Sequence, residues 1–186
     1  MKLYIKNMVC NRCKMVVEDV LKTSGLHPTS VELGEAVIIE DLTDEKKKQV
    51  NENLQPLGFE LIDDKKSRLI EQIKSLIIQS IHHSNEGLNT NYSDFLAQKL
   101  HHDYSYLSNL FSSVEGITIE KYIILQKTEK VKELLLYDEL SVSEIADRMG
   151  YSSVAHLSSQ FKKVTGSTPS QFRNLRQKHR IPIDNL

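Results

Sequence analysis

Two cysteines near the N-terminus are the residues of this 186-residue chain best suited to chemistry. Cys10 and Cys13 follow a strand-like run and open a helix-like run, so both thiols stand at one expected helix N-terminus. The helix dipole and Arg12 favour thiolates there. Two soft thiolates suit Cu(I), and suit Zn(II) less well because a structural zinc usually takes four ligands. Three interpretations stay open: a metal site, a redox-responsive dithiol, or an idle pair in a retained fold.

A second informative pattern is an internal repeat in the last hundred residues. Five positions recur fifty residues later with the same or a similar residue type, namely Leu107 and Leu157, Phe111 and Phe161, Gly116 and Gly166, Thr118 and Thr168, and Tyr122 and Phe172. A short repeat made of helix, turn and helix indicates a tandem pair of helix-turn-helix units. That organisation points to a protein that reads DNA.

Each repeat contains a helix with one apolar and one small, polar side. The residues expected to be buried are Leu107, Leu110, Phe111 and Val114 in the first helix, and Val154, Leu157, Phe161 and Val164 in the second. The residues expected to face outward are Ser105, Tyr106, Ser108, Asn109 and Ser112, and then Ala155, His156, Ser158, Ser159, Lys162 and Lys163. Small polar residues are poor helix formers, but they suit close approach to a DNA groove. The alternative, a solvated face of an ordinary helical domain, is weakened because both helices share the pattern.

The elements that would position these residues follow from the hydrophobic periodicity. Residues 1–64 predict the order strand, helix, strand, strand, helix, strand, which is the ferredoxin-like βαββαβ plan. An amphipathic helix over 68–82 opens an all-α domain over 65–186, and polar residues 84–91 follow it. Residues 119–137 contain no Gly or Pro and predict one continuous helix between the repeats. The fold class is therefore α+β in two domains, 1–64 and 65–186.

Composition narrows the class of protein. The chain is 39% hydrophobic and 26% charged, as soluble globular proteins are. No apolar run is long enough for a membrane span or a signal peptide, so the expected location is the cytoplasm, with no membrane partner. The net charge is −4 over residues 1–64, zero over 85–186 and +4 over 141–186, so charge alone supports DNA binding weakly. No catalytic triad, carboxylate pair or phosphate loop indicates an enzyme.

Residues 69–173 resemble the AraC-type family of bacterial transcription regulators. The resemblance is strongest over 143–146, 150–153 and 161–173, which read SEIA, GYSS and FKKVTGSTPSQFR. It implies seven helices, with two recognition helices that enter successive major-groove segments of duplex DNA. The outward-facing residues of both repeats would then contact DNA, and Lys127 stands on the linking helix where the family usually has a basic residue. Family members often place Arg on these surfaces, and neither helix here does.

Residues 1–64 resemble the heavy-metal-associated domain of copper chaperones and metal-transporting ATPases. The resemblance is carried by Met8, Cys10 and Cys13 in the pattern Met-x-Cys-x-x-Cys, by the βαββαβ order, and by the run LGFE at 57–60. It implies that the two cysteines bind metal, that Met8 packs inward as a loop anchor, and that Phe59 lies near the site. The family's usual Gly before the Met is Asn7 here.

The sequence as a whole predicts a transcription regulator, with no enzymatic activity, that binds double-stranded DNA. Metal, with Cu(I) favoured over Zn(II), or the thiol state at Cys10 and Cys13 would control it. A homodimer and RNA polymerase are further candidate partners. The alternative is a metal chaperone or thiol-exchange module whose DNA binding is vestigial. The neutral C-terminal domain favours this alternative slightly, whereas the long C-terminal motif favours the regulator more strongly.

Overall fold

In the computed structural model of the protein, the residues described are 1–62, 65–83, 91–137 and 139–177. The chain divides into two compact units, Met1–Leu76 with Leu96–His102, and Ile77–Phe95 with Asp103–Leu186. The domain boundary predicted after residue 64 falls at residues 63–64, which lie outside the described residues. The predicted polar run over 84–91 lies outside them as far as residue 90.

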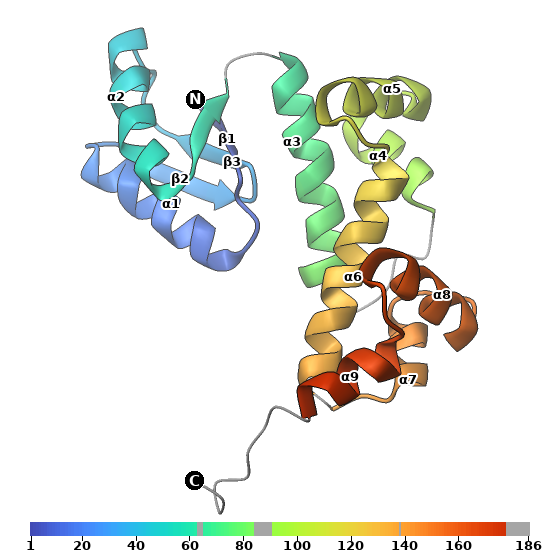
Figure 1. The fold of residues 1–186 in the computed structure, drawn as a ribbon. Coiled ribbons are helices and arrows are strands. Elements are labelled where there is room, and N and C mark those ends of the chain that lie inside the picture. The colour runs from blue at the N-terminus through green and yellow to red at the C-terminus, as the bar shows by residue number, and fades with distance from the viewer. Residues whose placement is uncertain (63–64, 84–90, 138, 178–186) are drawn as a thin grey trace, which may run out of the picture. The chain divides into compact units, whose positions relative to one another are not determined.

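The first unit begins with a mixed α and β segment. Its elements are β1 (Lys2–Lys6), α1 (Asn11–Thr23), β2 (Pro28–Glu32), β3 (Glu35–Ile38), α2 (Asp44–Leu54), a short 3-10 turn η1 (Gln55–Leu57) and β4 (Glu60–Ile62). This is the order of strands and helices that the sequence predicts. The four strands form one antiparallel sheet in the order β2-β3-β1-β4 (Figure 1).

Apolar residues of the sheet and its two helices form the core of this segment. Alternation along β1 buries Leu3 and Ile5, as expected of a half-buried strand. Helix α1 packs against β2, α2 packs against β4, and the two helices pack against each other, so both cover one face of the sheet. Val17, Leu21 and Leu54 are buried on the inner sides of these helices. The cysteines at the start of α1 are not part of this core.

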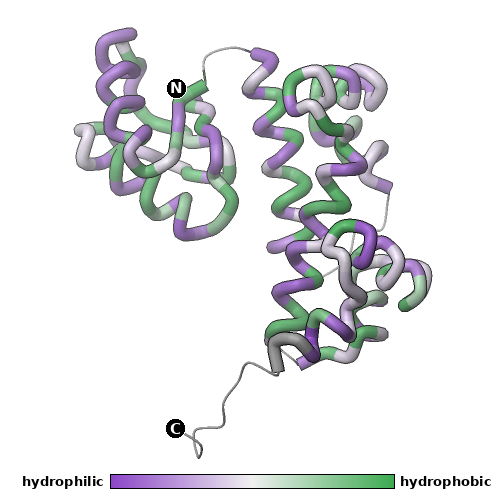
Figure 2. Tube along the Cα trace, in the orientation of Figure 1, coloured by the Kyte–Doolittle hydropathy of each residue, from purple (hydrophilic) through white to green (hydrophobic). Residues whose placement is uncertain are grey.

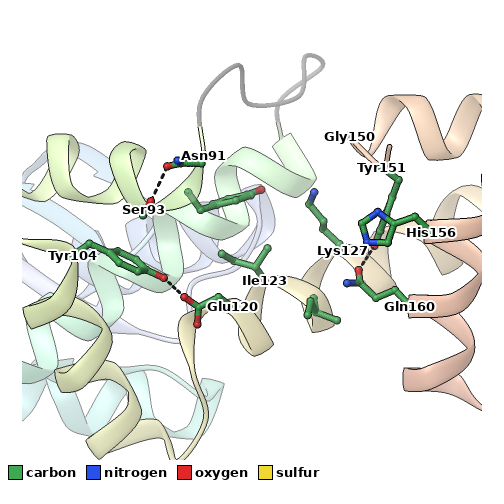
Figure 3. Close-up of a pocket in the computed structure, with 12 residues that line it drawn as sticks. Asn91, Ser93, Tyr104, Glu120, Ile123, Lys127, Gly150, Tyr151, His156 and Gln160 are labelled. Carbon is green, nitrogen blue, oxygen red and sulfur yellow. Dashed lines mark hydrogen bonds between the residues drawn. The ribbon is translucent and has the colours of Figure 1, made fainter. Parts of the chain in front are cut away.

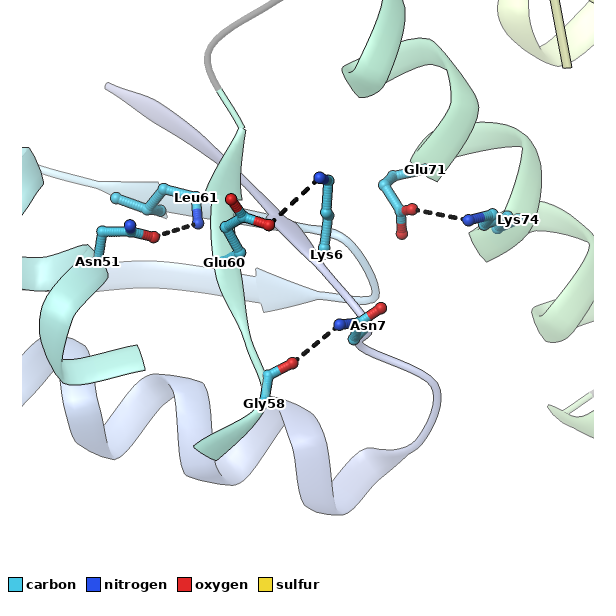
Figure 4. A network of polar contacts seen from close by, with 8 residues as sticks. All are labelled: Lys6, Asn7, Asn51, Gly58, Glu60, Leu61, Glu71 and Lys74. Carbon is cyan, nitrogen blue, oxygen red and sulfur yellow. Dashed lines mark hydrogen bonds and ion pairs between the residues drawn. The ribbon is translucent and has the colours of Figure 1, made fainter. Parts of the chain in front are cut away.

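Polar contacts fix the end of the sheet that leads into the thiol loop (Figure 4). Lys6 Nζ lies 3.2 Å from Glu60 Oε2, so an ion pair joins β1 to β4. The backbone N–H of Leu61 donates to Asn51 Oδ1 at 2.8 Å and ties β4 to α2. The side chain of Asn7 donates to the carbonyl oxygen of Gly58 at 2.9 Å. The chain therefore leaves β1 at a fixed position, immediately before the cysteines.

The rest of the described chain is helical. Its elements are α3 (Lys65–Ile78), a π-helical turn η2 (Gln79–His83), α4 (Tyr92–Leu100), α5 (Tyr104–Glu115), α6 (Ile119–Tyr137), α7 (Val142–Arg148), α8 (Val154–Thr165) and α9 (Pro169–Gln177). Within the described residues these are seven α-helices, the number that the family resemblance implies. The predicted helix over 119–137 is confirmed as α6. The helix predicted over 68–82 is present, but it starts earlier and its last turn is π-helical.

Helix α6 is the central element of the second unit. It packs against η2, α5, α7, α8 and α9 (Figure 1). Ile119, Val131 and Leu135 are buried along it, and the buried hydroxyl of Thr128 donates to the carbonyl oxygen of Ile124 at 2.8 Å. Figure 2 shows hydrophobic and hydrophilic residues interspersed along this helix, as its many neighbours require. The two halves of the repeat are thus built on one shared helix.

The repeated aromatic residues make the same ring contact in both copies of the repeat. Phe111 lies 5.5 Å from Tyr122 between ring centroids, and Phe161 lies 5.6 Å from Phe172. Phe111 and Phe161 are fully buried, and their partners Tyr122 and Phe172 are half-buried. The sequence repeat is therefore a repeat of aromatic pairs that hold α5 and α8 in place.

A second repeated feature ends the two helices. Gly116 and Gly166 adopt left-handed φ angles of 70° and 82°, which glycine reaches without a Cβ clash. Their backbone N–H groups donate to the carbonyl oxygens of Ser112 and Lys162, at 3.1 and 2.9 Å. The chain turns sharply after each helix in the same way.

Two residues predicted to be buried are exposed. Val114 is 54% exposed, Val154 is 40% exposed and Val164 is half-buried, whereas the other predicted inner residues of α5 and α8 are buried, namely Leu107, Leu110, Phe111, Leu157 and Phe161. Val114 lies in the last turn of α5 and Val154 is the first residue of α8. The helical spacing of the apolar residues is as predicted, but near a helix end the neighbouring helices no longer cover the side chain.

Candidate nucleic-acid interface and thiol pair

Side-chain hydrogen bonds fix the second helix-turn-helix, α7 and α8. Ser141 and Glu144 form the predicted capping box at the start of α7, with both reciprocal hydrogen bonds present. Ser153 caps α8 by accepting from the backbone N–H of His156 at 3.1 Å. The hydroxyl of Tyr151, in the turn, donates to Gln160 Oε1 of α8 at 2.7 Å. The outward side of α8 is therefore held on a well-defined support.

Helix α8 presents the side that the sequence predicts. Leu157 and Phe161 point inward and are buried. Of the six predicted outward residues, Ser158 is half-buried and the other five are exposed, namely Ala155, His156, Ser159, Lys162 and Lys163. The ring of His156 is also held locally, because its Nδ1 lies 3.1 Å from the hydroxyl of Ser152. This side offers short polar groups and two cations.

Helix α5 presents a comparable side with no formal charge. Among the predicted residues, Ser105, Tyr106 and Asn109 are exposed, and Ser108 and Ser112 are half-buried. The hydroxyl of Tyr104, at the first turn, donates to Glu120 of α6 at 2.5 Å. Burial first, and then the Glu120 carboxylate, raise the pKa of Tyr104, so it stays a neutral donor. This bond joins the start of α5 to the central helix.

Lys127 lies in a different environment from the other predicted DNA-contacting residues (Figure 3). Its ammonium donates to the carbonyl oxygen of Met149 at 2.8 Å. It lies 5.3 Å from the ring centroid of Tyr151 and 5.8 Å from that of Tyr92, within the range of cation–π attraction. Desolvation by burial lowers its pKa. Lys127 thus ties α6 to the end of α7 and the following turn.

The contact of Lys127 with Met149 was not predictable from the sequence. Tyr92 and Lys127 are far along the chain from each other and from Met149 and Tyr151, and no periodicity links the three segments. Arg173, which belongs to the family-like C-terminal run, is likewise engaged, because it donates to the carbonyl oxygen of Leu140 at 2.5 Å. Neither cation is therefore as available to an external anion as Lys162 and Lys163.

The thiol pair is formed as the sequence predicts. Cys10 is the N-cap of α1, Cys13 lies in its first turn, and both are half-buried free cysteines. The two sulfur atoms are 3.4 Å apart. The backbone N–H and then the thiol of Cys13 lower the pKa of the Cys10 thiol, and Arg12 adds to this effect. Cys10 therefore forms a thiolate more readily than an ordinary cysteine does.

The loop that leads to the cysteines is held in place by the burial of Met8 and by a hydrogen bond from Asn7. Met8 is only 2% exposed, so it packs inward as the resemblance implies, and Phe59 is also buried. Asn7 adopts a left-handed φ of 68°, the conformation for which glycine is favoured and which asparagine tolerates. The hydrogen bond from Asn7 to Gly58 holds this conformation. The departure from the family's glycine is therefore accommodated by the backbone.

The donor set fits a soft metal ion with few ligands. A metal–sulfur distance of about 2.3 Å allows one ion to touch two sulfurs that are 3.4 Å apart. Within the described part of the chain, no group of three or more His, Cys, Asp or Glu residues could hold a metal ion. One chain thus offers two thiolates, which suits two-coordinate Cu(I) better than four-coordinate Zn(II). The same pair could also be oxidised to a disulfide.

Comparison with known proteins identifies the helical part of the chain. Residues 96–175 match the family model described as a helix-turn-helix domain. The chain is 37% identical over 71 residues to the xylose operon regulatory protein of Escherichia coli strain K12. That match covers 38% of this chain and 18% of the relative. The chain thus spans less than a fifth of the length of that curated relative.

Solved structures give the same result. The C-terminal domain of AraT, a response regulator from Geobacillus stearothermophilus, is 29% identical with a TM-score of 0.51, over 64% of this chain and 93% of that domain. A Chromobacterium violaceum transcriptional regulator, described as an AraC-type DNA-binding domain-containing protein, shares the fold with a TM-score of 0.52 at 24% identity, over 61% of this chain and 96% of that one. No helix of the described residues is long and apolar enough to cross a membrane. Residues 96–175 therefore form a helix-turn-helix domain whose fold is similar to that of AraC-type DNA-binding domains.

Proposed function

We propose that the chain is a sequence-specific DNA-binding transcription regulator that reads duplex DNA with α5 and α8. The observation that carries this proposal is the repeated construction of the two helices. Each is held inward by a leucine and a phenylalanine, ends at a left-handed glycine, and turns short polar side chains outward. The regulatory role named for the Escherichia coli relative supports the same assignment.

The proposed contacts lie in two successive major-groove segments about 34 Å apart, one turn of the double helix. Helix α6 joins the two reading helices, and its nineteen residues span about 28 Å at 1.5 Å per residue. The proposed DNA-contacting residues are Ser105, Tyr106, Ser108, Asn109, Ser112, Ala155, His156, Ser158, Ser159, Lys162 and Lys163. Lys127 joins this set by family resemblance alone, because its ammonium is bonded to Met149.

Selection from random duplexes followed by charge reversal tests the assignment. A double substitution Ser158→Glu with Ser159→Glu in α8 should abolish binding to the selected duplex, since carboxylates repel phosphates. The pair Ser108→Glu with Asn109→Glu in α5 should act in the same way. A matched control is Ser170→Glu with Asn174→Glu, two exposed residues of α9, which should retain most of the affinity. Wild-type affinity in both reading-helix variants would refute the proposed interface.

We further propose that residues 1–64 form a ferredoxin-like, heavy-metal-associated sensor domain, and 65–186 the DNA-reading domain. The strand order β2-β3-β1-β4 with both helices on one face supports this arrangement. The buried Met8 and the lowered pKa of the Cys10 thiol support Cu(I) as the signal, and the 3.4 Å separation lets both sulfurs touch one ion. A bound metal would change DNA affinity several-fold or more, since couplings between sites are commonly about 1–3 kcal/mol.

An anaerobic Cu(I) titration against a competing chelator tests the sensor. Wild type should withdraw one Cu(I) per chain, whereas Cys10→Ser should not, and its circular dichroism should be unchanged because the sheet core excludes Cys10. Met15→Leu is the control, because Met15 is an exposed sulfur residue in the same helix. If wild type and Cys10→Ser withdraw equal metal, the sensor proposal fails while the DNA proposal stands.

A second candidate function is a metal chaperone or thiol-exchange module with vestigial DNA binding. The observation that favours it is the lack of charge on the reading side of α5, together with the inward engagement of Lys127 and Arg173. A selection that yields no preferred duplex, together with tight Cu(I) binding by Cys10 and Cys13, would favour this candidate. A homodimer and RNA polymerase remain candidate partners of the regulator.

A further inference from the structure

The second unit contains a cavity of about 380 Å³. It lies between the start of α5, the central helix α6 and the first turns of α8 (Figure 3). Tyr104 and Glu120 line one end, His156 and Gln160 line the other, and Ile123 and Ile124 contribute an apolar wall. The cavity thus touches both helix-turn-helix units.

Lys127 contributes a positive charge to this cavity. Its ammonium is bonded to a neutral acceptor, the carbonyl oxygen of Met149. Among the described residues, no carboxylate forms an ion pair with it, and desolvation is the one cause that shifts its pKa. A partly desolvated ammonium without a counter-charge is unfavourable. An anion entering the cavity would supply that counter-charge.

The walls around Lys127 are flat and apolar. The rings of Tyr92 and Tyr151 both line the cavity, with centroids 5.8 and 5.3 Å from the ammonium. The hydroxyl of Tyr151 donates to Gln160, and the hydroxyl of Tyr92 accepts from Ser80, so both hydroxyls are held by neighbouring side chains. These rings therefore offer apolar surface, as do Ile123 and Ile124. The carboxylate of Glu120 also lines the cavity, where it accepts from the hydroxyl of Tyr104 at the end away from His156 and Gln160. Beside Lys127, one cation with aromatic and aliphatic walls is a composition that suits a small organic anion.

We propose that this cavity binds a small organic carboxylate with a flat apolar body, and that Lys127 is its charge partner. The inference goes beyond the proposed function, which gives the helical unit no small-molecule ligand, although His156 and Lys127 of the proposed DNA-contacting set also line the cavity. A phosphate of the DNA backbone could also meet the ammonium. The apolar walls and the volume favour the carboxylate, since a phosphate diester would leave those walls without a partner.

Calorimetric titration of the full chain with 2-naphthoate, and with its neutral isostere 2-naphthamide, tests the proposal. Wild type should bind the acid about tenfold or more tightly than the amide, because a hydrogen bond to a charged group is lost with the amide. Lys127→Met should bind acid and amide alike. Lys121→Met, an exposed lysine of the same helix, should keep the wild-type preference for the acid.

A second variant guards against misfolding of Lys127→Met. Ile124→Trp fills the cavity and keeps the charge, so it should bind neither compound while its circular dichroism stays native. Equal binding of acid and amide by folded wild type, or saturable binding of the acid by Ile124→Trp, would overturn the proposal. So would the absence of 2-naphthoate binding at millimolar concentration. If Lys127→Met instead lowers the salt dependence of DNA binding and naphthoate does not bind, the anion is a DNA phosphate.

Discussion

Lys162 and Lys163 stand exposed in the last turn of α8, on the helix proposed to read DNA. Two other cations of the domain are engaged inside it, since Lys127 bonds Met149 and Arg173 bonds Leu140. The two exposed lysines should therefore neutralise a large part of the phosphate charge that the domain contacts. Replacing both with alanine should weaken DNA binding and make it less sensitive to salt.

The size of the effect follows from counterion release. The slope of log affinity against log salt is about −0.9 for each phosphate neutralised, so loss of two contacts should reduce the slope by about 1.8. Between about 50 and 200 mM salt, the wild-type affinity should then fall roughly twelvefold more than that of the Lys162→Ala, Lys163→Ala variant. The total slope should be shallow, because the C-terminal residues 85–186 carry no net charge.

Fluorescence anisotropy with the selected duplex at four or more salt concentrations measures the slope. The matched control is Lys46→Ala with Lys48→Ala in α2, which removes the same charge from the other unit and should leave the slope unchanged. Thermal melts must show native folding, because lysines near a helix C-terminus also favour the helix. A slope for the α8 variant equal to that of wild type would show that the DNA lies elsewhere.

Three further outcomes are expected. Gly166→Ala should lower the free energy of unfolding by about 1–2 kcal/mol in urea denaturation, because its φ of 82° is strained for alanine although its added Cβ meets no atom within 4 Å. A double-mutant cycle of Phe161→Leu and Phe172→Leu should give a coupling of about 0.5–1.5 kcal/mol, and additive effects would contradict the edge-to-face contact of the two rings. The thiolate absorbance of Cys10 should appear at a pH below the usual thiol pKa of about 8.5; Cys13→Ala, which keeps the backbone N–H but removes the thiol, should move this midpoint partway upward, and an unchanged midpoint would contradict the contact between the two thiols.

Features with local signals in the chain were predictable. The capping box at Ser141 and Glu144 depends on residues three apart, and the continuous helix α6 depends on the absence of Gly and Pro. The repeat of Phe111 at Phe161 identified two buried anchors, because the fifty-residue offset keeps the chemical type. The element order of residues 1–62 also followed from periodicity alone.

Features that depend on tertiary contacts were not predictable. The position of Lys127 is decided by Tyr92, Met149 and Tyr151, which no periodicity links to it. The exposure of Val114 and Val154 depends on where the neighbouring helices end, and a hydrophobic stripe carries no information about that. The proposed anion cavity arises from such contacts, so the sequence pattern gave no sign of it.

The two reading helices are alike in their buried anchors but unlike in their outward side chains, since α5 offers Tyr106 and Asn109 where α8 offers His156 and Ser159. If α5 and α8 read DNA as proposed, a single chain would recognise two different base sequences in a fixed order. Such a site is not a palindrome and has a polarity along the DNA. Bound to it, one chain faces a defined direction, so that inverting the site relative to a promoter would turn the opposite face of the protein toward the start of transcription. Orientation as well as occupancy would then determine the regulatory output.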